Sequence, residues 1–166
     1  MYQEYMFTIE LQPQDGTLTL TKFSDYSLRL LIYLGLHQDR LVSVGEVSRA
    51  YRISPHIMVK AVQLLVEHDL IASVRGRNGG LRLNQPPGEI NVGWVIRRTE
   101  PGWDLVECFD AASNTCPIDG ACGLKGALKR AQRAFLEELD RHTLADFLPR
   151  APVLIRLLHR SRDAHP

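Results

Sequence analysis

The sequence predicts a mainly α-helical protein with one small β-hairpin. Three observations support this. Apolar residues recur at helical spacing through the first third of the chain, a glycine-rich segment at residues 76–80 separates two β-prone runs, and a long helical pattern runs from about residue 124 to 141. With 166 residues, the chain is long enough for one ordinary domain or for a small domain with an extension.

The first two helices are predicted from their caps. Ser24 is expected to cap a helix with Asp25 in its first turn, where a carboxylate suits the helix dipole, and this helix should reach about His37. Ser43 and Glu46 have the spacing of a capping box, in which each side chain accepts a hydrogen bond from the other residue's amide. A second helix should therefore start at Ser43.

A third helix and a hairpin follow. Ser54 is the predicted cap, Pro55 suits the first helical position, and the helix should end near residues 68–69. Its inward-facing residues are predicted to be Met58, Ala61, Val62 and Leu65. Residues 71–75 and 81–84 are expected to pair as strands, because the glycines and the Asn-Gly pair between them tolerate positive φ.

This order of elements is that of a winged helix-turn-helix, in which the third helix enters the major groove of DNA and the hairpin is the wing. The outward positions of the third helix are His56, Val59, Lys60 and Gln63. The predicted DNA contacts are Ser54, Pro55, His56, Lys60 and Gln63 on the helix, and Arg75, Arg77, Asn78, Gly79, Gly80 and Arg82 on the hairpin. A basic hairpin alone could be a solvated turn, but two capped helices before it favour DNA binding.

Charge and composition agree with a nucleic-acid contact. The net charge is +1, and residues 20–85 hold nine Lys or Arg against five acids. No apolar run approaches the ~20 residues that a membrane span needs, and the N-terminus lacks the pattern of a secretory signal. We therefore expect a cytoplasmic protein with reduced thiols.

The second half is expected to hold a short helix capped by Asn91, a loop at residues 100–123 and a long helix from about Leu124 to Arg141. The apolar seam of the long helix is Leu124, Ala127, Leu128, Ala131, Phe135 and Leu139. A last short helix opens at Thr143, and residues 153–158 form an apolar C-terminal segment.

All three cysteines, Cys108, Cys116 and Cys122, fall in the loop at residues 100–123. An odd number cannot form a closed disulfide set in one chain, and three is one fewer than a structural zinc site or a common iron–sulfur cluster requires. Three interpretations of the cysteines remain open: inert free thiols, a zinc site with an added Asp or His, and an iron–sulfur cluster with a non-cysteine ligand. In the last case a displaceable ligand would expose one iron to nitric oxide or oxygen, which is typical of a sensor.

Several motifs together resemble the iron–sulfur winged-helix transcriptional repressors, the family of IscR, RirA and NsrR. The resemblance covers about residues 18–148. It is carried by residues 20–26 (LTKFSDY), 74–80 (VRGRNGG), 123–125 (GLK) and 143–146 (TLAD) together with the cysteine loop. Residues 23–26, 58–60 and 104–106 are most similar to the nitric-oxide-sensing members, of which NsrR is the example.

The resemblance implies a homodimer paired through the long helix, one iron–sulfur cluster (4Fe-4S or 2Fe-2S) per subunit and a near-palindromic DNA operator. The implied cluster ligands are Cys108, Cys116 and Cys122, with Asp25 of the partner subunit as possible fourth ligand. A helix-terminal charge is an equally good interpretation of Asp25. The implied function is a non-enzymatic repressor that nitric oxide releases from its operator.

Two departures keep a second interpretation open. Family members of the NsrR type often carry Asn-His where this chain has His56-Ile57, and the seven residues between Cys108 and Cys116 match the RirA-like iron regulators. The alternative is therefore an iron- or redox-responsive regulator of the RirA or IscR type. A thiol- or zinc-dependent enzyme is a third interpretation, which the lack of a nucleophile–base pair or nucleotide loop disfavours. A structural zinc module that binds DNA without sensing a signal is a fourth.

The predicted organisation has five parts: an N-terminal extension at 1–19, a DNA-binding domain at 20–87, a short helix and cluster loop at 88–123, a dimerisation helix and cap at 124–148, and a tail at 149–166. Family members commonly begin with Met at the place held here by Leu18. We therefore expect a non-ATG start at codon 18, which would leave residues 1–17 untranslated.

Overall fold

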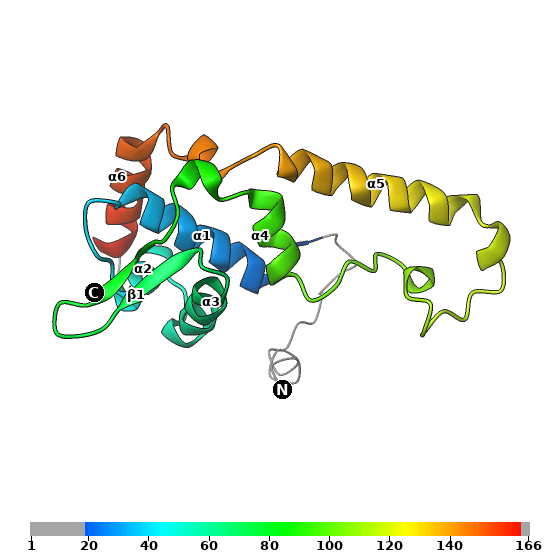
Figure 1. Ribbon diagram of the computed structural model, residues 1–166, viewed down its shortest axis with the longest axis horizontal. Helices are drawn as coiled ribbons and strands as arrows, with labels where there is room; N and C mark the ends of the chain where they lie inside the picture. Colours follow the sequence, from blue (N-terminus) through cyan, green and yellow to red (C-terminus); the bar gives the residue numbers. More distant parts are fainter. Residues whose placement is uncertain (1–18, 164–166) are drawn as a thin grey trace.

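Residues 22–99 form four α-helices and a hairpin that pack together as the body of the protein, and a long helix extends away from this body (Figure 1). The computed structural model describes residues 19–163, with side chains described up to residue 160. The helices are α1 (Lys22–Leu36), α2 (Val44–Tyr51), α3 (Pro55–Glu67), α4 (Val92–Thr99), α5 (Gly123–Asp140) and α6 (Ala151–Asp163). The strands are β1 (Ile71–Val74) and β2 (Gly80–Leu83), and the short 3₁₀ helices are η2 (Pro87–Glu89), η3 (Glu107–Phe109), η4 (Asp119–Ala121) and η5 (Leu144–Phe147).

The predicted class, mainly α with one small antiparallel hairpin, is confirmed for the described residues. The suggested start at Leu18 and nearly all of the predicted extension lie outside them. The five-part division of the chain remains a prediction.

Helix α1 begins earlier than its predicted cap. Thr21, not Ser24, is the N-cap, and its hydroxyl accepts a hydrogen bond from the Ser24 amide at 3.1 Å. Thr21 in turn donates from its amide and its hydroxyl to Glu100 Oε1, at 2.9 and 3.2 Å. Ser24 therefore lies one turn inside the helix, where it is buried against the core.

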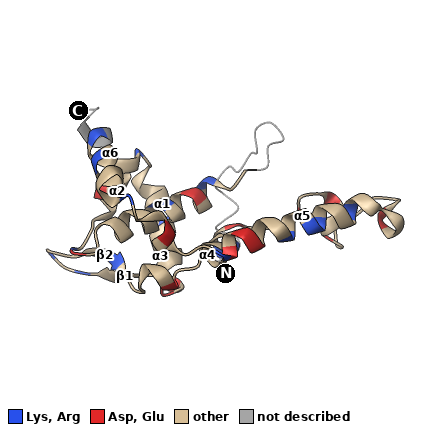
Figure 2. Cartoon of the chain, turned by 90° about the horizontal axis from the view of Figure 1, so that it is seen from above, with Lys and Arg blue, Asp and Glu red and all other residues tan. Residues whose placement is uncertain are grey.

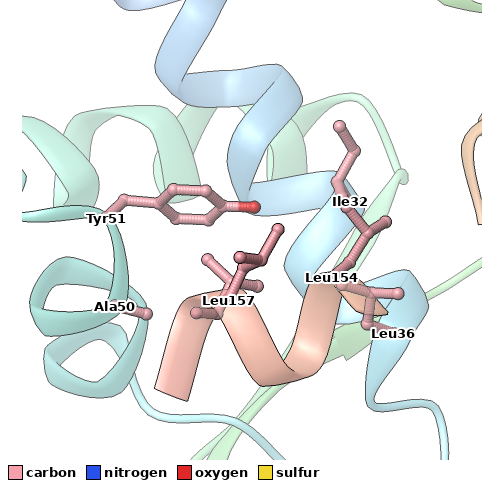
Figure 3. Close-up of a pocket in the computed structure, with 7 residues that line it drawn as sticks. Ile32, Leu36, Ala50, Tyr51, Leu154 and Leu157 are labelled. Atoms are coloured by element: carbon pink, nitrogen blue, oxygen red, sulfur yellow. The ribbon is translucent and has the colours of Figure 1, made fainter. Parts of the chain in front are cut away.

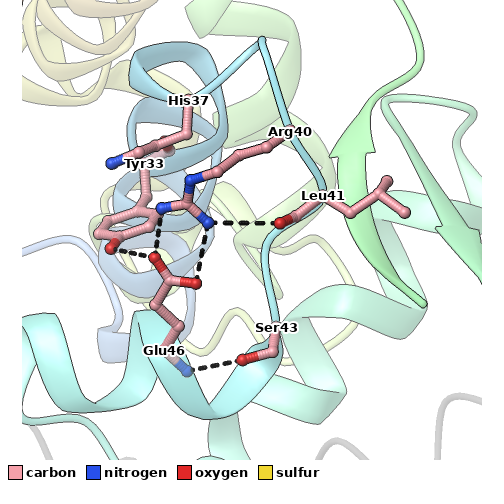
Figure 4. A network of polar contacts seen from close by, with 6 residues as sticks. All are labelled: Tyr33, His37, Arg40, Leu41, Ser43 and Glu46. Carbon is pink, nitrogen blue, oxygen red and sulfur yellow. Dashed lines mark hydrogen bonds and ion pairs between the residues drawn. The ribbon is translucent and has the colours of Figure 1, made fainter. Parts of the chain in front are cut away.

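The capping box of α2 forms only by half. Ser43 Oγ accepts from the Glu46 amide at 3.1 Å, as predicted. The Glu46 carboxylate instead accepts from Tyr33 Oη at 2.9 Å and from both terminal nitrogens of Arg40, at 2.5 and 3.0 Å (Figure 4). The prediction was wrong for this side chain because a charged donor outcompetes a neutral amide for a carboxylate.

The inward face of α3 is positioned largely as predicted. Met58, Ala61 and Leu65 are buried, Val62 is half-buried, and the helix ends at Glu67 with His68 as C-cap. Ser54 stands at the N-cap position, but its side chain makes no capping hydrogen bond, so only the position was correct. The buried core around these residues also contains Phe23, Leu30, Leu31, Tyr33, Leu34, Val42, Val47, Ala50, Ile53, Leu70, Ile71, Leu81, Ile90, Val95 and Leu144.

The hairpin pairs Ile71 with Leu83 and Val74 with Gly80. Its turn needs two glycines for different reasons. Gly76 has φ +117°, which side chains rarely adopt, whereas a Cβ on Gly79 would clash with the carbonyl oxygen of Val74. The expected positive φ is thus at Gly76 and not at Asn78.

The segment after α4 runs out to the far end of α5, and α5 returns to the body, so the two form an arm (Figure 1). Asn91 caps α4 as predicted by accepting from the Trp94 amide at 2.8 Å. At the joint between arm and body, Arg97 forms a two-pronged ion pair with Asp140 of α5. The Asn91 amide also donates to the Asp140 carbonyl oxygen at 2.6 Å, and together these contacts connect the arm to α4.

The predicted apolar segment at residues 153–158 is part of α6, which packs on α2 and lies beside α1. Between these helices lies a cavity of about 250 Å³ (Figure 3). It is lined by Ile32, Leu36, Ala50, Tyr51, Leu154, Leu157 and Leu158. Burial raises the pKa of Tyr51 to about 12. The C-terminal helix thereby extends the apolar packing of the body.

Candidate functional site

Helix α3 and the hairpin lie side by side on the body and carry the predicted DNA-contact residues. On α3, Ser54, Pro55, His56 and Gln63 are exposed and Lys60 is half-buried. Ser54 and Pro55 lie at the N-terminal end of the helix. His56, Lys60 and Gln63 lie on the side opposite the buried residues, because side chains three or four positions apart share a face. The packing of α3 therefore leaves a polar face open to a ligand.

The wing carries unpaired positive charge. Arg75, Arg77 and Arg82 are exposed, and within residues 19–163 none of them forms an ion pair. Asn78 is also exposed, whereas Gly79 and Gly80 are half-buried at the base of the turn. The charged residues along the hairpin can be followed in Figure 2. Unpaired guanidinium groups of this kind suit phosphate oxygens.

The three cysteines lie on the outer part of the arm. Cys108 is in η3, Cys116 precedes η4, and Cys122 is the N-cap residue of the 18-residue helix α5. All three are free thiols and half-buried.

Hydrogen bonds within the loop shape the segment between the cysteines. Glu107 accepts from the amide and the hydroxyl of Thr115, and Asp110 accepts from the Ala112 amide and the Ser113 hydroxyl. These bonds lower the pKa of both carboxyl groups. The Asn114 side chain accepts from the Cys116 amide at 3.1 Å, which orients the backbone at the second thiol.

Lys125 joins the loop to the start of α5. Its ammonium lies 2.5 Å from Asp119 Oδ1. The hydrogen bond to Asp119 raises the pKa of Lys125, and the nearby Cys108 and Cys116 raise it further. The lysine therefore lies within electrostatic reach of two of the three thiols.

The three cysteines fit an iron–sulfur cluster better than they fit a single metal ion. No group of three His, Cys, Asp or Glu side chains converges as one metal ion would require, among residues 19–163. A cluster differs in this respect, because its thiolates bind separate iron atoms. The fit rests on three half-buried thiols on one loop, a lysine beside two of them and a helix N-terminus at the third.

Asp25 lies in the first turn of α1 and is not grouped with the cysteines of its own chain. Its carboxylate accepts from Arg29 Nε at 2.9 Å and lies 2.6 Å from Arg29 Nη2. The Arg29 guanidinium also stacks over Tyr26 and Tyr51, with its central carbon 5.6 and 5.8 Å from the ring centroids. Asp25 thus makes an internal ion pair while 42% of its side chain stays exposed.

Sequence reasoning missed two contacts that hold the loop to the rest of the chain. Glu100 accepts hydrogen bonds from Thr21, the N-cap of α1, which is 79 residues away, and Gln132 of α5 donates to the carbonyl oxygen of Trp103. The Trp103 ring also packs against Phe135, with centroids 6.4 Å apart. Neither contact has a local sequence signal, because each joins residues that only the folded chain brings together.

Most of the chain is similar in sequence to known transcriptional regulators. The sequence pattern of the Rrf2 family, described as an iron-dependent transcriptional regulator, matches residues 20–150. The HTH-type transcriptional regulator NsrR of Halalkalibacterium halodurans is 45% identical over 140 residues, which cover 84% of this chain and 96% of that protein. NsrR of Shouchella clausii is 45% identical over 130 residues, covering 78% and 87%.

Solved structures show a similar fold. The structure of CymR, described as the global cysteine regulator of B. subtilis, covers 79% of this chain and 96% of its own, with 26% identity and a TM-score of 0.62. The likeness supports the winged-helix interpretation of α1 to α3 and the hairpin. In this chain no helix of the described part is long and apolar enough to span a membrane.

Proposed function

This chain belongs to the Rrf2 family of transcriptional regulators, and from that premise we propose a DNA-binding repressor that senses nitric oxide through a labile iron–sulfur cluster. One observation carries the proposal. Three thiols gather on one loop in a chain that is 45% identical to a regulator named NsrR. Because the relatives are transcriptional regulators, we propose a cytoplasmic protein without catalytic activity.

The DNA contact would be made by α3 and the wing. The exposed polar face of α3 suits base edges and phosphates in the major groove, and the unpaired arginines Arg75, Arg77 and Arg82 suit the backbone or a narrow minor groove. A recognition helix contacts the base edges with its N-terminal residues, which here include His56 and Lys60.

A homodimer would form through α5. None of the residues of α5 is buried in the single chain, although its seam is apolar. Leu124 is 65% exposed and Phe135 42% exposed. Pairing with a second copy would cover this seam and give the two-fold symmetry that a near-palindromic operator requires.

Cys108, Cys116 and Cys122 would hold the cluster, with Asp25 of the partner subunit as fourth ligand. A bound 4Fe-4S or 2Fe-2S cluster would supply an iron whose oxygen ligand nitric oxide can displace. Arg29 would compete for the same carboxylate, because it already binds both Asp25 oxygens within the chain. Return of Asp25 to Arg29 would free α1 from the partner's loop, let the two α3 helices shift and weaken operator binding.

Anaerobic purification followed by iron and sulfide counting and a nitric oxide titration of DNA binding tests the proposal. We expect a brown protein whose operator affinity falls as nitric oxide is added. A preparation that contains neither iron nor acid-labile sulfur and still binds its operator tightly would contradict the proposal.

Substitution of the thiols gives a sharper test. Cys108→Ala, Cys116→Ala and Cys122→Ala should each abolish the chromophore and specific DNA binding together, because each removes one cluster ligand. Ala111→Ser, at an exposed position of the same loop, is the matched control and should keep both. Asp25→Ala should change the cluster's absorption spectrum or its rate of reaction with nitric oxide. If both stay unchanged, Asp25 is only a helix-terminal charge.

An iron- or redox-responsive regulator of the RirA or IscR type is the second candidate. The seven residues between Cys108 and Cys116 favour it. The two candidates differ in the signal that releases DNA. Release by an iron chelator without nitric oxide would support the second candidate, whereas release by nitric oxide in iron-replete buffer would support the first.

A further inference from the structure

Val59 is a large apolar residue that the fold leaves uncovered on the face of α3 proposed to meet DNA. Its side chain is 42% exposed, whereas its neighbour Met58 is fully buried. His56, one turn before it, and Gln63, one turn after it, are also exposed. An apolar side chain therefore stands among the polar groups of this face.

Nothing in the described chain uses the outer surface of Val59. The orientation of α3 on the core is determined by Met58, Ala61 and Leu65, which are at most 1% exposed. The helix therefore cannot rotate to bury Val59 without exposing these three side chains. A β-branched residue is also a weaker helix former than alanine. Neither packing nor helix propensity accounts for valine at this position.

The major groove offers one apolar group that a valine can contact, the C5 methyl of thymine. Val59 lies in the second turn of α3, within the N-terminal part of a recognition helix that approaches base edges. Lys60 and the wing arginines supply the charge that brings phosphates to the same surface. The surroundings of Val59 are thus complementary to a groove and not to an apolar protein partner.

We propose that Val59 recognises a thymine in each operator half-site by packing against its 5-methyl group. The inference rests on the proposed function, because it requires α3 to enter the major groove. It adds a specificity-determining residue and names the base that this residue selects.

Deoxyuridine substitution tests the contact, because deoxyuridine differs from thymidine only by that methyl group. The full-length protein, purified without oxygen, would first select its operator from a pool of random duplexes. Each thymine of the selected site would then be replaced by deoxyuridine, and binding measured for the wild type and for Val59→Ala. We expect one symmetric pair of positions to lose about fourfold in affinity per half-site in the wild type, as for one buried methylene equivalent.

In Val59→Ala the same replacement should change affinity by less than twofold. Val66→Ala is the matched control, since Val66 is 37% exposed on the same helix but two turns further from its start. That variant should keep the fourfold loss. Circular dichroism and the cluster's absorption should match the wild type in both variants, because the two side chains are exposed.

The inference is overturned if no thymine methyl matters to the wild type, or if Val59→Ala stays as sensitive as the wild type. A protein that selects no sequence at all would instead overturn the proposed function. The two failures are therefore distinguishable.

Discussion

At the scale of single residues, Glu46 illustrates how a side chain can take partners that its sequence neighbours do not indicate. Its carboxylate binds Arg40 and Tyr33 in place of the amide of its own helix cap. The hydrogen bonds from Arg40, and then from Tyr33, lower the pKa of Glu46 from 4.5 to about 2, against the opposing effect of burial. The ion pair joins the end of α1, the following loop and α2 (Figure 4).

Glu46→Gln should lower the stability of the protein at pH 7, because it removes the charge that Arg40 binds. A carboxyl group whose pKa is lower in the folded than in the unfolded chain stabilises the fold at pH values above its pKa in the unfolded chain. That stabilisation disappears as the pH falls from about 4.5 to about 2. Urea denaturation followed by circular dichroism should therefore show a difference between wild type and variant at pH 7 that shrinks towards pH 3.

Asp39→Asn is the control for this series, since Asp39 is an exposed carboxylate in the adjacent loop. It should unfold like the wild type throughout. If Glu46→Gln lowered the free energy of unfolding equally at pH 3 and pH 7, the shape of the Glu46 side chain, and not its charge, would make the contact stabilising.

At the scale of elements, the wing depends on its backbone as much as on its charge. Gly76 supplies the positive φ and Gly79 the close approach to Val74, so the turn can hold Arg75 and Arg77 beyond the strands. The bridge between Val42 and Leu81 ties β2 to the segment before α2. The wing is therefore positioned by the same body that positions α3.

Arg77→Ala should weaken operator binding and reduce the slope of log affinity against log salt by about one, as for the loss of one phosphate contact. Fluorescence anisotropy at several salt concentrations measures this. Arg133→Ala removes an equal charge from α5, where Arg133 is 70% exposed, and should leave the slope unchanged. An unchanged slope in Arg77→Ala would remove this residue from the interface.

At the scale of the whole molecule, the arm meets the body where the end of α5 packs beside α4. Gly93 of α4 lies so close to Asp140 that an added Cβ would clash with its carboxylate and approach its backbone nitrogen to 2.9 Å. Arg97 and Asn91 then bind Asp140 from the same helix. This joint and the hydrogen bonds from Thr21 to Glu100 are two connections between the segment that carries the cysteines and helices α1 to α3.

Gly93→Ala should destabilise the protein by about 1–3 kcal/mol, as overpacking usually does, because it forces α4 and α5 apart. The measurement is the free energy of unfolding in urea. Gly126→Ala in α5 is the matched control, as its added Cβ would meet only Arg130 at 3.4 Å, an ordinary contact distance. Alanine is also the better helix former, so that variant should be at least as stable as the wild type.

The oligomeric state can be tested on the seam of α5. Ala131→Glu should convert the proposed dimer to a monomer, because it places a charge among apolar residues that pairing would bury. Arg133→Glu introduces the same side chain on the opposite side of α5 and should stay dimeric. Light scattering after size-exclusion chromatography distinguishes the two, and a dimeric Ala131→Glu variant would exclude this seam as the interface.

Local sequence signals were sufficient for most elements. Spacing of apolar residues located α3 and α5 to within a residue or two, and Pro55, Asn91 and the glycine-rich turn marked their element boundaries. The grouping of all three cysteines in one loop was evident from their positions in the sequence. These signals act between residues a few positions apart, where backbone geometry alone determines which side chains meet.

Only the tertiary structure decided the contacts between distant segments. Thr21 as cap, Glu100 as its partner and the capture of Glu46 by Arg40 all depend on which donors the fold brings within reach. So does the exposure of Val59, since periodicity marks an outward position but not whether another element covers it. The amino-acid order by itself determined the helices, the wing and the thiol loop, whereas packing in three dimensions determined their partners, because hydrogen bonds form with the nearest suitable group in space.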